Sequence, residues 1–181
     1  MAKKRLFKSA SSTSGFSLLE ALVVVALVGI ISAFAGPGWL TYLNRRQVSS
    51  ARTDLLQALR QAQTDARQQN SSRVVNIVST TNPPQIQIGS TAGSGRVVDL
   101  GEENAAASLS VNGGSLAGGA ASSVTFDYKG TLDDDVVPFV FSVTSDKLND
   151  GGVRCVVVTT LLGNLIQAEG DNCNNLAGYE N

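Results

Sequence analysis

The sequence predicts an α+β fold in which one long N-terminal helix packs on an antiparallel β-sheet domain. Three observations support this: an uncharged apolar run near the N-terminus, an apolar stripe at helical spacing after it, and short strand-like segments over the remaining chain. With 181 residues, the chain is long enough for one domain plus an anchor.

The composition excludes several kinds of site. The chain has no histidine, which rules out Ser-His-Asp and Cys-His catalysis and every histidine-containing metal site. Two cysteines are too few for a Cys-rich zinc site. Lys+Arg 14 against Asp+Glu 15 gives a net charge of −1, so no overall basic excess indicates nucleic acid. We therefore expect no enzymatic activity, no catalytic residues, no metal and no cofactor.

Residues 1–15 form a basic leader that precedes an apolar run. The basic residues of the leader are Lys3, Lys4, Arg5 and Lys8, and it contains no acid. The run Ala21–Leu40 has no charged residue and spans about 30 Å as a helix, the thickness of a bilayer core. Four leader cations outweigh Arg45 and Arg46 beyond the run, which predicts a cytoplasmic N-terminus and an extracytoplasmic C-terminal domain.

A secretory signal peptide is the alternative interpretation of this start. The run is longer than the apolar core of a signal peptide, about 7–15 residues, although residues 32–35 imitate a cleavage site. Glu20 lies beside the run, and a charge at mid-bilayer costs about 2.5–3.5 kcal/mol. The residues alone leave two readings of Glu20 open: it reaches the interface from the helix start, or it has a function within the membrane.

The segment Gly15-Phe16-Ser17-Leu18-Leu19-Glu20 resembles the processing site of type IV prepilins and pseudopilins. The resemblance implies a pilin-like fold, cleavage by a prepilin peptidase between Gly15 and Phe16, and methylation of the new N-terminal amine of Phe16. Glu20 then stands where the family has its glutamate, and the resemblance implies that it pairs with this amine during assembly. Gly29 and Pro37 also fall where the family commonly carries glycine and proline.

Pro37 is expected to kink the helix. It lacks a backbone N–H and clashes with the preceding turn, and Gly36 and Gly38 flank it. A complete break that ends the membrane segment is the alternative. We divide the chain into a leader (1–15), a transmembrane and polymerisation helix (16–43), an amphipathic helix (44–70) and a β-rich domain (71–181).

The helix is expected to continue beyond the membrane to about Gln69. A single apolar stripe with helical spacing comprises Val48, Ala51, Leu55, Leu59, Ala62 and Ala66. The stripe suits packing on a sheet, and a solvated coiled-coil arm is the alternative. Six of the ten basic residues after the leader lie within 45–73, which raises a nucleic-acid hypothesis, whereas a solvated helix face with Asp54 and Asp65 interleaved is the simpler interpretation.

Strand-like segments follow from Arg73. The candidates are Val74–Val78, Gln85–Ile88, Val97–Leu100, Leu109–Val111, Val124–Tyr128, Pro138–Val143, Val153–Thr160 and Leu165–Ala168. Gly89–Ser123 is expected to be a variable loop region with one or two weak strands. Asp133-Asp134-Asp135 and the segment 145–152 have the composition of metal loops, but we interpret both as polar turns because their spacing does not suit one ion.

The C-terminal half resembles minor pseudopilins of the general secretion pathway H type, which include FimT-like minor pilins. The resemblance rests on residues 51–78, on VTFDYKGTL at 124–132 and on CVVVTTLLGNLIQ at 155–167. FimT-like DNA binding uses a basic C-terminal motif, and this chain has no basic residue after Arg154.

The two resemblances together imply a minor pilin or pseudopilin that assembles into, or primes, a type IV pilus-like or type II secretion filament. The implied partners are the prepilin peptidase, other pilin subunits, the inner-membrane assembly platform and the lipid bilayer. A DNA-binding minor pilin for DNA uptake is the alternative.

Cys155 and Cys173 are expected to form a disulfide, because two cysteines in an extracytoplasmic domain usually pair. A two-residue turn at Gly163-Asn164 would place Cys155 opposite position 172, and a bulge or loop after Gly170 would bring Cys173 to it. Two buried free thiols are the alternative.

Overall fold

The computed structural model describes residues 15–78, 81–101, 108–115, 119–148 and 152–173, with residues 34–37 described by their backbone alone. The chain divides into two compact units, Met1–Trp39 and Leu40–Asn181. A single helix, α1 (Leu18–Gln68), is shared between them and begins and ends within two residues of the sequence-based expectation.

Membrane crossing remains a prediction. Within the described part of the chain, no helix is by itself long and apolar enough to cross a membrane. The segments Leu18–Ala33 and Gly38–Gln68, which a bend separates, meet the length and composition requirements only as a pair. The kink at Pro37 likewise stays a prediction.

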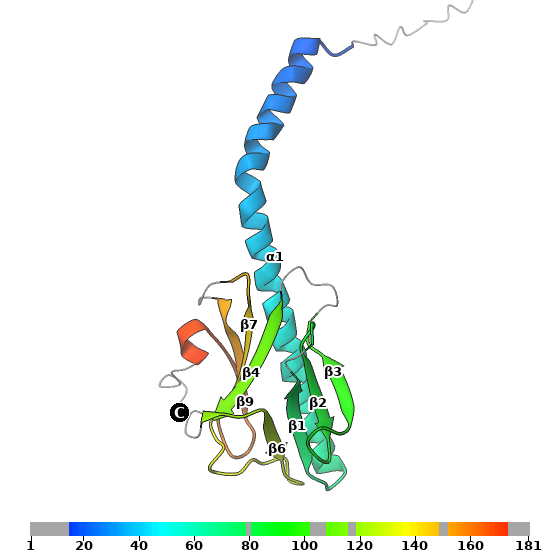
Figure 1. Ribbon diagram of the computed structural model, residues 1–181, viewed down its shortest axis with the longest axis vertical. Coiled ribbons are helices and arrows are strands. Elements are labelled where there is room, and N and C mark those ends of the chain that lie inside the picture. The colour runs from blue at the N-terminus through cyan, green and yellow to red at the C-terminus, as the bar shows by residue number, and fades with distance from the viewer. Residues whose placement is uncertain (1–14, 79–80, 102–107, 116–118, 149–151, 174–181) are drawn as a thin grey trace, which may run out of the picture. The chain divides into compact units, whose positions relative to one another are not determined.

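The second unit contains two antiparallel sheets beside the C-terminal part of α1 (Figure 1). The first has the order β3-β2-β1-β6 and the second the order β5-β4-β7-β8-β9. The strands of the first sheet are β1 (Arg73–Val78), β2 (Gln85–Gly89), β3 (Arg96–Asp99) and β6 (Ser123–Phe126). Those of the second are β4 (Leu109–Ser115), β5 (Gly119–Ala120), β7 (Phe139–Ser145), β8 (Arg154–Val158) and β9 (Leu165–Glu169).

The apolar stripe of α1 forms the centre of the core. Its six members, Val48, Ala51, Leu55, Leu59, Ala62 and Ala66, each expose 0% of their surface. They share one apolar cluster with side chains of both sheets, including Ile86 of β2, Phe126 of β6 and Phe141 of β7. The expectation that the stripe packs on a sheet is therefore confirmed, except that two sheets cover it where the sequence suggested one.

All eight expected strands are present, with ends that differ from the expectation by at most four residues. The sequence did not reveal β5, which has two residues, or the short 3-10 helix η2 (Gly170–Cys173). The β4 strand also extends through Gly113 and Gly114 to Ser115, because pairing with β7 outweighs the low strand propensity of glycine.

The expected register of the last hairpin was wrong. Cys155 pairs with Ala168, four residues before the expected position. The N–H of Gly163 donates to the carbonyl oxygen of Thr160 at 2.8 Å, so the turn centres on residues 161 and 162. Gly163 follows at φ 75°, a left-handed conformation that suits glycine and closes a turn with a bulge.

A shift of four residues leaves the faces of the hairpin unchanged, because side chains alternate with a period of two. Val156 and Val158 point to the α1 side and join the main core, whereas Cys155 and Val157 belong to a second cluster on the opposite face. In that cluster Cys173 of η2 forms a disulfide with Cys155, with 5.8 Å between their Cα atoms. The predicted disulfide is present in the structure, reached through η2 in place of a bulge.

Candidate functional site

The residues expected to be processed lie at the start of α1. Gly15 and Phe16 precede the helix, and Phe16 exposes 83% of its surface. A Cβ atom added at Gly15 would meet no atom within 4 Å, so the glycine is not required by packing within the chain. The segment is therefore accessible to an enzyme, as a cleavage site must be.

The first unit presents apolar side chains to its surroundings all around the helix. Those with large exposed surfaces are Leu18, Leu19, Leu22, Val23, Val24, Val25, Leu27, Val28, Ile30 and Ile31, which expose between 46% and 83%. Because these residues cover every direction around the axis, this segment has no polar face that could meet water. Exposed apolar side chains on every face favour an apolar environment for this segment.

Glu20 is the only Asp, Glu, Lys or Arg between Phe16 and Asn44. Its exposed side chain lies in the first turn of α1, where the positive end of the helix dipole favours a carboxylate. In an apolar environment the helix end alone does not replace the lost hydration of a carboxylate, so a cationic partner would stabilise it strongly. The apolar side chains of this segment can pack against any apolar surface. Glu20, in contrast, favours an arrangement in which a cationic group lies next to it.

Two of the five arginines of α1 contact other elements of the second unit. Arg52 pairs with Glu169 at 3.1 Å, and Arg67 donates from Nε to the carbonyl oxygen of Lys129 at 2.8 Å. Arg73, which follows the helix, donates to the side-chain oxygen of Gln69. Partial burial lowers the pKa of Arg52, although a guanidinium remains charged at neutral pH. The solvated helix face expected from the sequence holds for Arg45, Arg46, Arg60 and Arg67, which are exposed, but not for Arg52, whose side chain exposes 14% of its surface.

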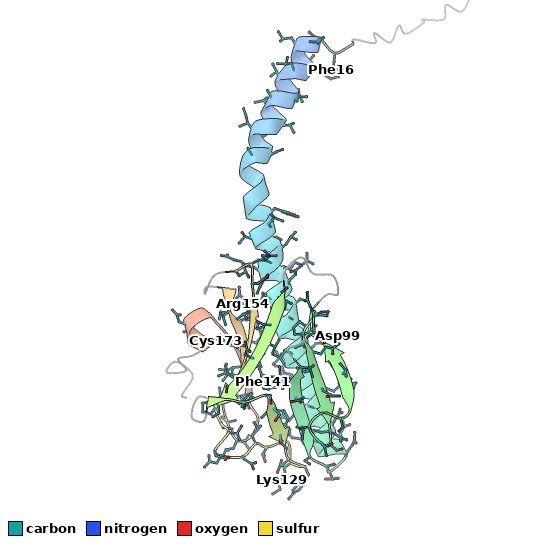
Figure 2. The ribbon with its side chains drawn as sticks, in the orientation of Figure 1. Phe16, Asp99, Lys129, Phe141, Arg154 and Cys173 are labelled. Carbon is teal, nitrogen blue, oxygen red and sulfur yellow. A yellow bond between two sulfur atoms is a disulfide. The ribbon has the colours of Figure 1, made fainter. Side chains whose placement is uncertain are left out.

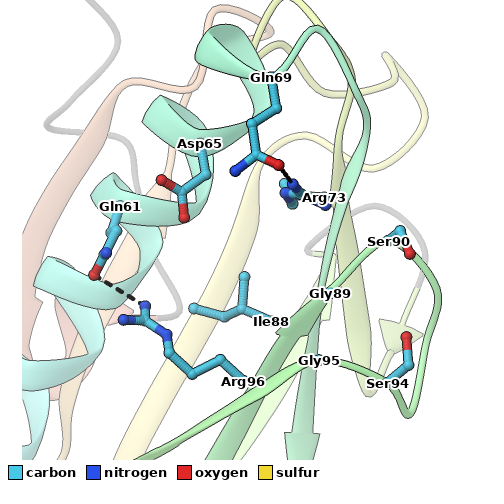
Figure 3. A pocket seen from close by; sticks show the side chains of 10 residues that line it. All are labelled: Gln61, Asp65, Gln69, Arg73, Ile88, Gly89, Ser90, Ser94, Gly95 and Arg96. Carbon is cyan, nitrogen blue, oxygen red and sulfur yellow. Dashed lines mark hydrogen bonds between the residues drawn. The ribbon is translucent and has the colours of Figure 1, made fainter.

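A polar pocket of ≈ 480 Å³ lies between α1 and the β2–β3 hairpin (Figure 3). Arg96 donates to the side-chain oxygen of Gln61 at 2.9 Å, and Asp65 lies beside Gln61 on the same wall of the pocket. Sequence reasoning did not identify this pocket, because its residues lie up to 35 positions apart and form no motif.

No group of three metal-binding side chains is present in the part of the chain that the structure describes. Asp146 accepts a hydrogen bond from the N–H of Ser108 at 3.0 Å, which agrees with a polar turn after β7. Residues 149–151 of the considered calcium loop lie outside the described residues.

Gln63 joins α1 to two turns, a role that the sequence did not reveal. Its Nε2 donates to the carbonyl oxygens of Gly130 at 2.9 Å, Leu162 at 2.9 Å and Gly163 at 3.2 Å. The turn at Gly130 belongs to the FDYKG segment noted in the sequence, so the motif marks a contact with the helix. Glycine is needed at both Gly130 and Gly163, where φ is 72° and 75° and a Cβ would approach the Gln63 side chain within 3.0 Å.

Asp127 organises the FDYKG turn. Its Oδ1 accepts hydrogen bonds from the N–H groups of Lys129 at 2.9 Å and Thr131 at 2.8 Å. Desolvation raises the pKa of Asp127, but hydrogen bonds from Thr131 and Lys129 and the charge of Lys129 together lower it below its ordinary value. The carboxylate form therefore stabilises this turn.

Comparisons with known proteins give short sequence matches. Residues 11–36, which contain Gly15, Phe16 and Glu20, match the family described as the prokaryotic N-terminal methylation motif. The type IV major fimbrial protein FimA of Dichelobacter nodosus is 49% identical over 39 residues, 22% of this chain and 24% of that protein. A fimbrial protein of Moraxella nonliquefaciens is 42% identical over 43 residues, 24% of this chain and 28% of that protein. The matches thus span about a quarter of the length of these curated relatives.

The structural likeness extends further. The crystal structure of the type IV minor pilin FimU of Pseudomonas aeruginosa (strain PAO1) covers 70% of this chain and 92% of its own, with a TM-score of 0.54 and 22% identity. The likeness shows a pilin-like fold. Together with the N-terminal motif, it confirms the resemblance to type IV pilin-like proteins that the sequence indicated.

Proposed function

We propose that this chain is a minor pilin or pseudopilin, a structural subunit stored in the inner membrane and assembled into, or priming, a type IV pilus-like filament. One observation carries the proposal: from Leu18 to Ile31 the helix exposes apolar side chains on every face, and its single carboxylate, Glu20, lies within the methylation motif. Exposing such a helix to water is unfavourable, whereas a lipid bilayer or a bundle of parallel helices covers its apolar side chains.

In this proposal a prepilin peptidase cuts after Gly15 and methylates the amine of Phe16. Glu20 then pairs with the N-terminal amine of its own or a neighbouring subunit. A neighbour in the wrong axial position leaves both charges unpaired in an apolar bundle, so the pair selects the correct register. The second unit lies outside the cytoplasm, where its disulfide is stable, and the inner-membrane assembly platform is the proposed site of incorporation.

The proposal is tested by isolating the mature chain together with sheared filaments. Mass spectrometry is expected to show an N-terminal, methylated Phe16, and the chain is expected in the filament fraction at a low ratio to the main subunit. A mature chain that begins near Gly36 would establish an ordinary signal peptide and reject the proposal. If the mature chain begins at Phe16 but is found only in the membrane fraction, the proposed function would be restricted to priming of the filament.

A DNA-binding minor pilin is the alternative, and its arginines are the residues to test. Arg52 and Arg67 are engaged within the unit, which weakens this alternative. A DNA shift assay with the full chain at increasing salt distinguishes the two proposals, because binding through phosphate contacts weakens steeply with salt. Salt-sensitive binding that Arg60→Ala reduces would favour the alternative.

A further inference from the structure

The polar pocket between α1 and the β2–β3 hairpin, which we call the hairpin pocket, has a volume of ≈ 480 Å³ (Figure 3). Small-molecule sites have volumes of about 300–1,000 Å³. One wall of the pocket is a polar row of α1, Gln61, Asp65 and Gln69, whose spacing of four residues places the three side chains on one face of the helix. The pocket lies beside β3, whose last residue Asp99 lies on the opposite side of the unit from Cys173 (Figure 2).

The opposite wall of the hairpin pocket belongs to the first sheet. The register pairs Ile88 of β2 with Val75 of β1 and with Arg96 of β3, so these three side chains point to the same face of the sheet. Arg73 lies two residues before Val75 and therefore points to that face too. Val75 and Ile88 join the main core with the buried residues of α1, so this face is the one toward the helix. Both arginines thus face the polar row, and Ile88 lies between them as an apolar floor.

Each of these arginines is oriented by a glutamine of the polar row. Arg96 donates to the side-chain oxygen of Gln61 at 2.9 Å, and Arg73 donates to that of Gln69. A guanidinium carries five N–H donors, so each arginine retains donors for a ligand. Each glutamine uses its side-chain oxygen on an arginine and retains its NH2 group. The hairpin pocket therefore offers two oriented guanidinium groups and two amide donors.

Asp65 contributes a carboxylate acceptor to the same pocket. It lies between Gln61 and Gln69 in the polar row, and its side chain forms no hydrogen bond or ion pair with another described residue. A carboxylate accepts hydrogen bonds from hydroxyl groups, whereas it repels a second anionic group. A matching ligand therefore places an acidic group at the arginines and hydroxyl groups at Asp65.

We infer that the hairpin pocket binds a polyhydroxylated carboxylate of monosaccharide size, a hexuronic acid. The carboxylate of the sugar accepts hydrogen bonds from Arg73 or Arg96, and paired N–H groups of a guanidinium match its two oxygens. The hydroxyl groups accept from the glutamine NH2 groups and donate to Asp65. The inference goes beyond the proposed function and does not depend on it, because every residue involved lies in the second unit.

Two other classes of small ligand match the pocket less well. Inorganic phosphate carries more negative charge than a carboxylate and has no set of hydroxyl donors for Asp65, which repels it. A simple amino acid can pair its carboxylate with an arginine and its ammonium group with Asp65. It has no hydroxyl groups, however, to accept from the NH2 groups of Gln61 and Gln69.

The test measures the binding of sodium D-glucuronate to the full chain in deuterated detergent micelles by saturation-transfer NMR. Glucuronate is expected to bind. D-glucose, which shares the ring hydroxyl groups but has no carboxylate, and inorganic phosphate are then added as competitors. Each is expected to displace glucuronate at least roughly tenfold less effectively than unlabelled glucuronate itself, because each lacks one half of the recognised chemistry.

Three variants assign the binding to the hairpin pocket. Arg96→Gln removes one guanidinium and should weaken glucuronate binding roughly tenfold, because a charge-assisted pair is lost. Arg60→Gln is the matched control, since Arg60 is an exposed arginine of α1 that does not line the pocket, and it should leave the affinity unchanged. Asp65→Asn keeps an acceptor oxygen without the charge, so competition by phosphate should strengthen more than glucuronate binding does.

Several results would overturn the inference. These are no binding of glucuronate, equal effectiveness of glucuronate and phosphate on the wild type, or equal losses for Arg96→Gln and Arg60→Gln. Thiol labelling after denaturation verifies that each variant keeps its disulfide and hence its fold. Methyl glucuronoside, in which the anomeric oxygen is blocked as it is within a polysaccharide, separates the two sources of the sugar. Binding equal to that of glucuronate supports a polysaccharide residue as the ligand, and loss of binding supports a free sugar acid.

Discussion

The Nε2 atom of Gln63 donates a hydrogen bond to the carbonyl oxygen of Gly130 at 2.9 Å, which fixes the FDYKG turn to the helix. The same amide group reaches the last hairpin, so one polar side chain of α1 positions two turns that are far apart in sequence.

Replacing Gln63 is therefore expected to destabilise the second unit. Gln63→Ala leaves the carbonyl oxygens of Gly130 and Gly163, two buried residues, without this donor and should cost about 1–3 kcal/mol of unfolding free energy. Urea unfolding of the full chain in detergent measures the change. Gln57→Ala, an exposed glutamine on the same helix, is the control and should change the stability by less than about 0.5 kcal/mol. Equal effects of the two variants would show that the hydrogen bonds contribute little.

The Asp127 carboxylate is expected to make stability depend on pH in acid. Its pKa is lower in the folded chain than in the unfolded chain, so its contribution is complete above the ordinary pKa of about 3.9 and is lost as the pH falls through the folded pKa. Asp127→Asn keeps an acceptor oxygen but no charge. The stability advantage of the wild type over Asp127→Asn should therefore shrink between pH 5 and pH 2, roughly spanning these pKa values. A difference that stays constant over this range would mean that the charge has no role.

The disulfide is expected to hold η2 on the outer face of β8. Cys155 and Cys173 are 18 residues apart, and a loop of this size stabilises the fold by roughly 3 kcal/mol in the chain-entropy model. The Cys155→Ser and Cys173→Ser double variant should lose about this much unfolding free energy. In the wild type, labelling after denaturation without reductant should find no reactive thiol, and two reactive thiols would reject the bridge.

Processing should depend on the size of residue 15. Gly15→Val places a branched side chain beside the predicted cleaved bond and is expected to leave the chain unprocessed, with a mass that retains residues 1–15. Because a Cβ at this position meets no atom of the described residues within 4 Å, misfolding of the described units does not explain the loss. Gly29→Ala is the control, since that glycine also has open space around it and lies away from the bond. Normal cleavage of Gly15→Val would place the processing site elsewhere.

Glu20→Ala should separate membrane storage from assembly. Removing the carboxylate leaves an uncharged helix start, so membrane insertion should be unchanged or improved. Incorporation into filaments should fall at least roughly tenfold, because the N-terminal amine of Phe16 loses its partner in an apolar bundle. Quantitative blotting of membrane and filament fractions measures both quantities. Incorporation at the wild-type level would remove Glu20 from the assembly mechanism.

The helix and the strands were predictable from the sequence because their signals are local. The spacing of Val48 to Ala66 identifies the buried face of α1, and alternating apolar residues identify the strands. The division into two sheets was not predictable, since it depends on how β4 and β7 pair across a long separation. The hairpin register was missed because Leu161 and Leu162 occupy the turn, where the sequence offered Gly163 and Asn164 as better turn formers.

The N-terminal site was predictable because its motif is a continuous segment, whereas the contacts of the second unit were not. Gln63 resembles any other helix glutamine in the sequence, and only the folded chain brings Gly130 and Gly163 to it.

In the proposed function, the apolar side chains that α1 exposes from Leu18 to Ile31 have a consequence for the energetics of assembly. Lipid tails are as apolar as leucine side chains, so moving this helix from a bilayer into a bundle of similar helices yields little hydrophobic free energy. The free energies of the helix in the bilayer and in the bundle would then be similar. Small contributions, such as the pairing of Glu20, would decide which of the two states is favoured. A chain of this kind could be drawn from the membrane and returned to it repeatedly without being trapped in either place.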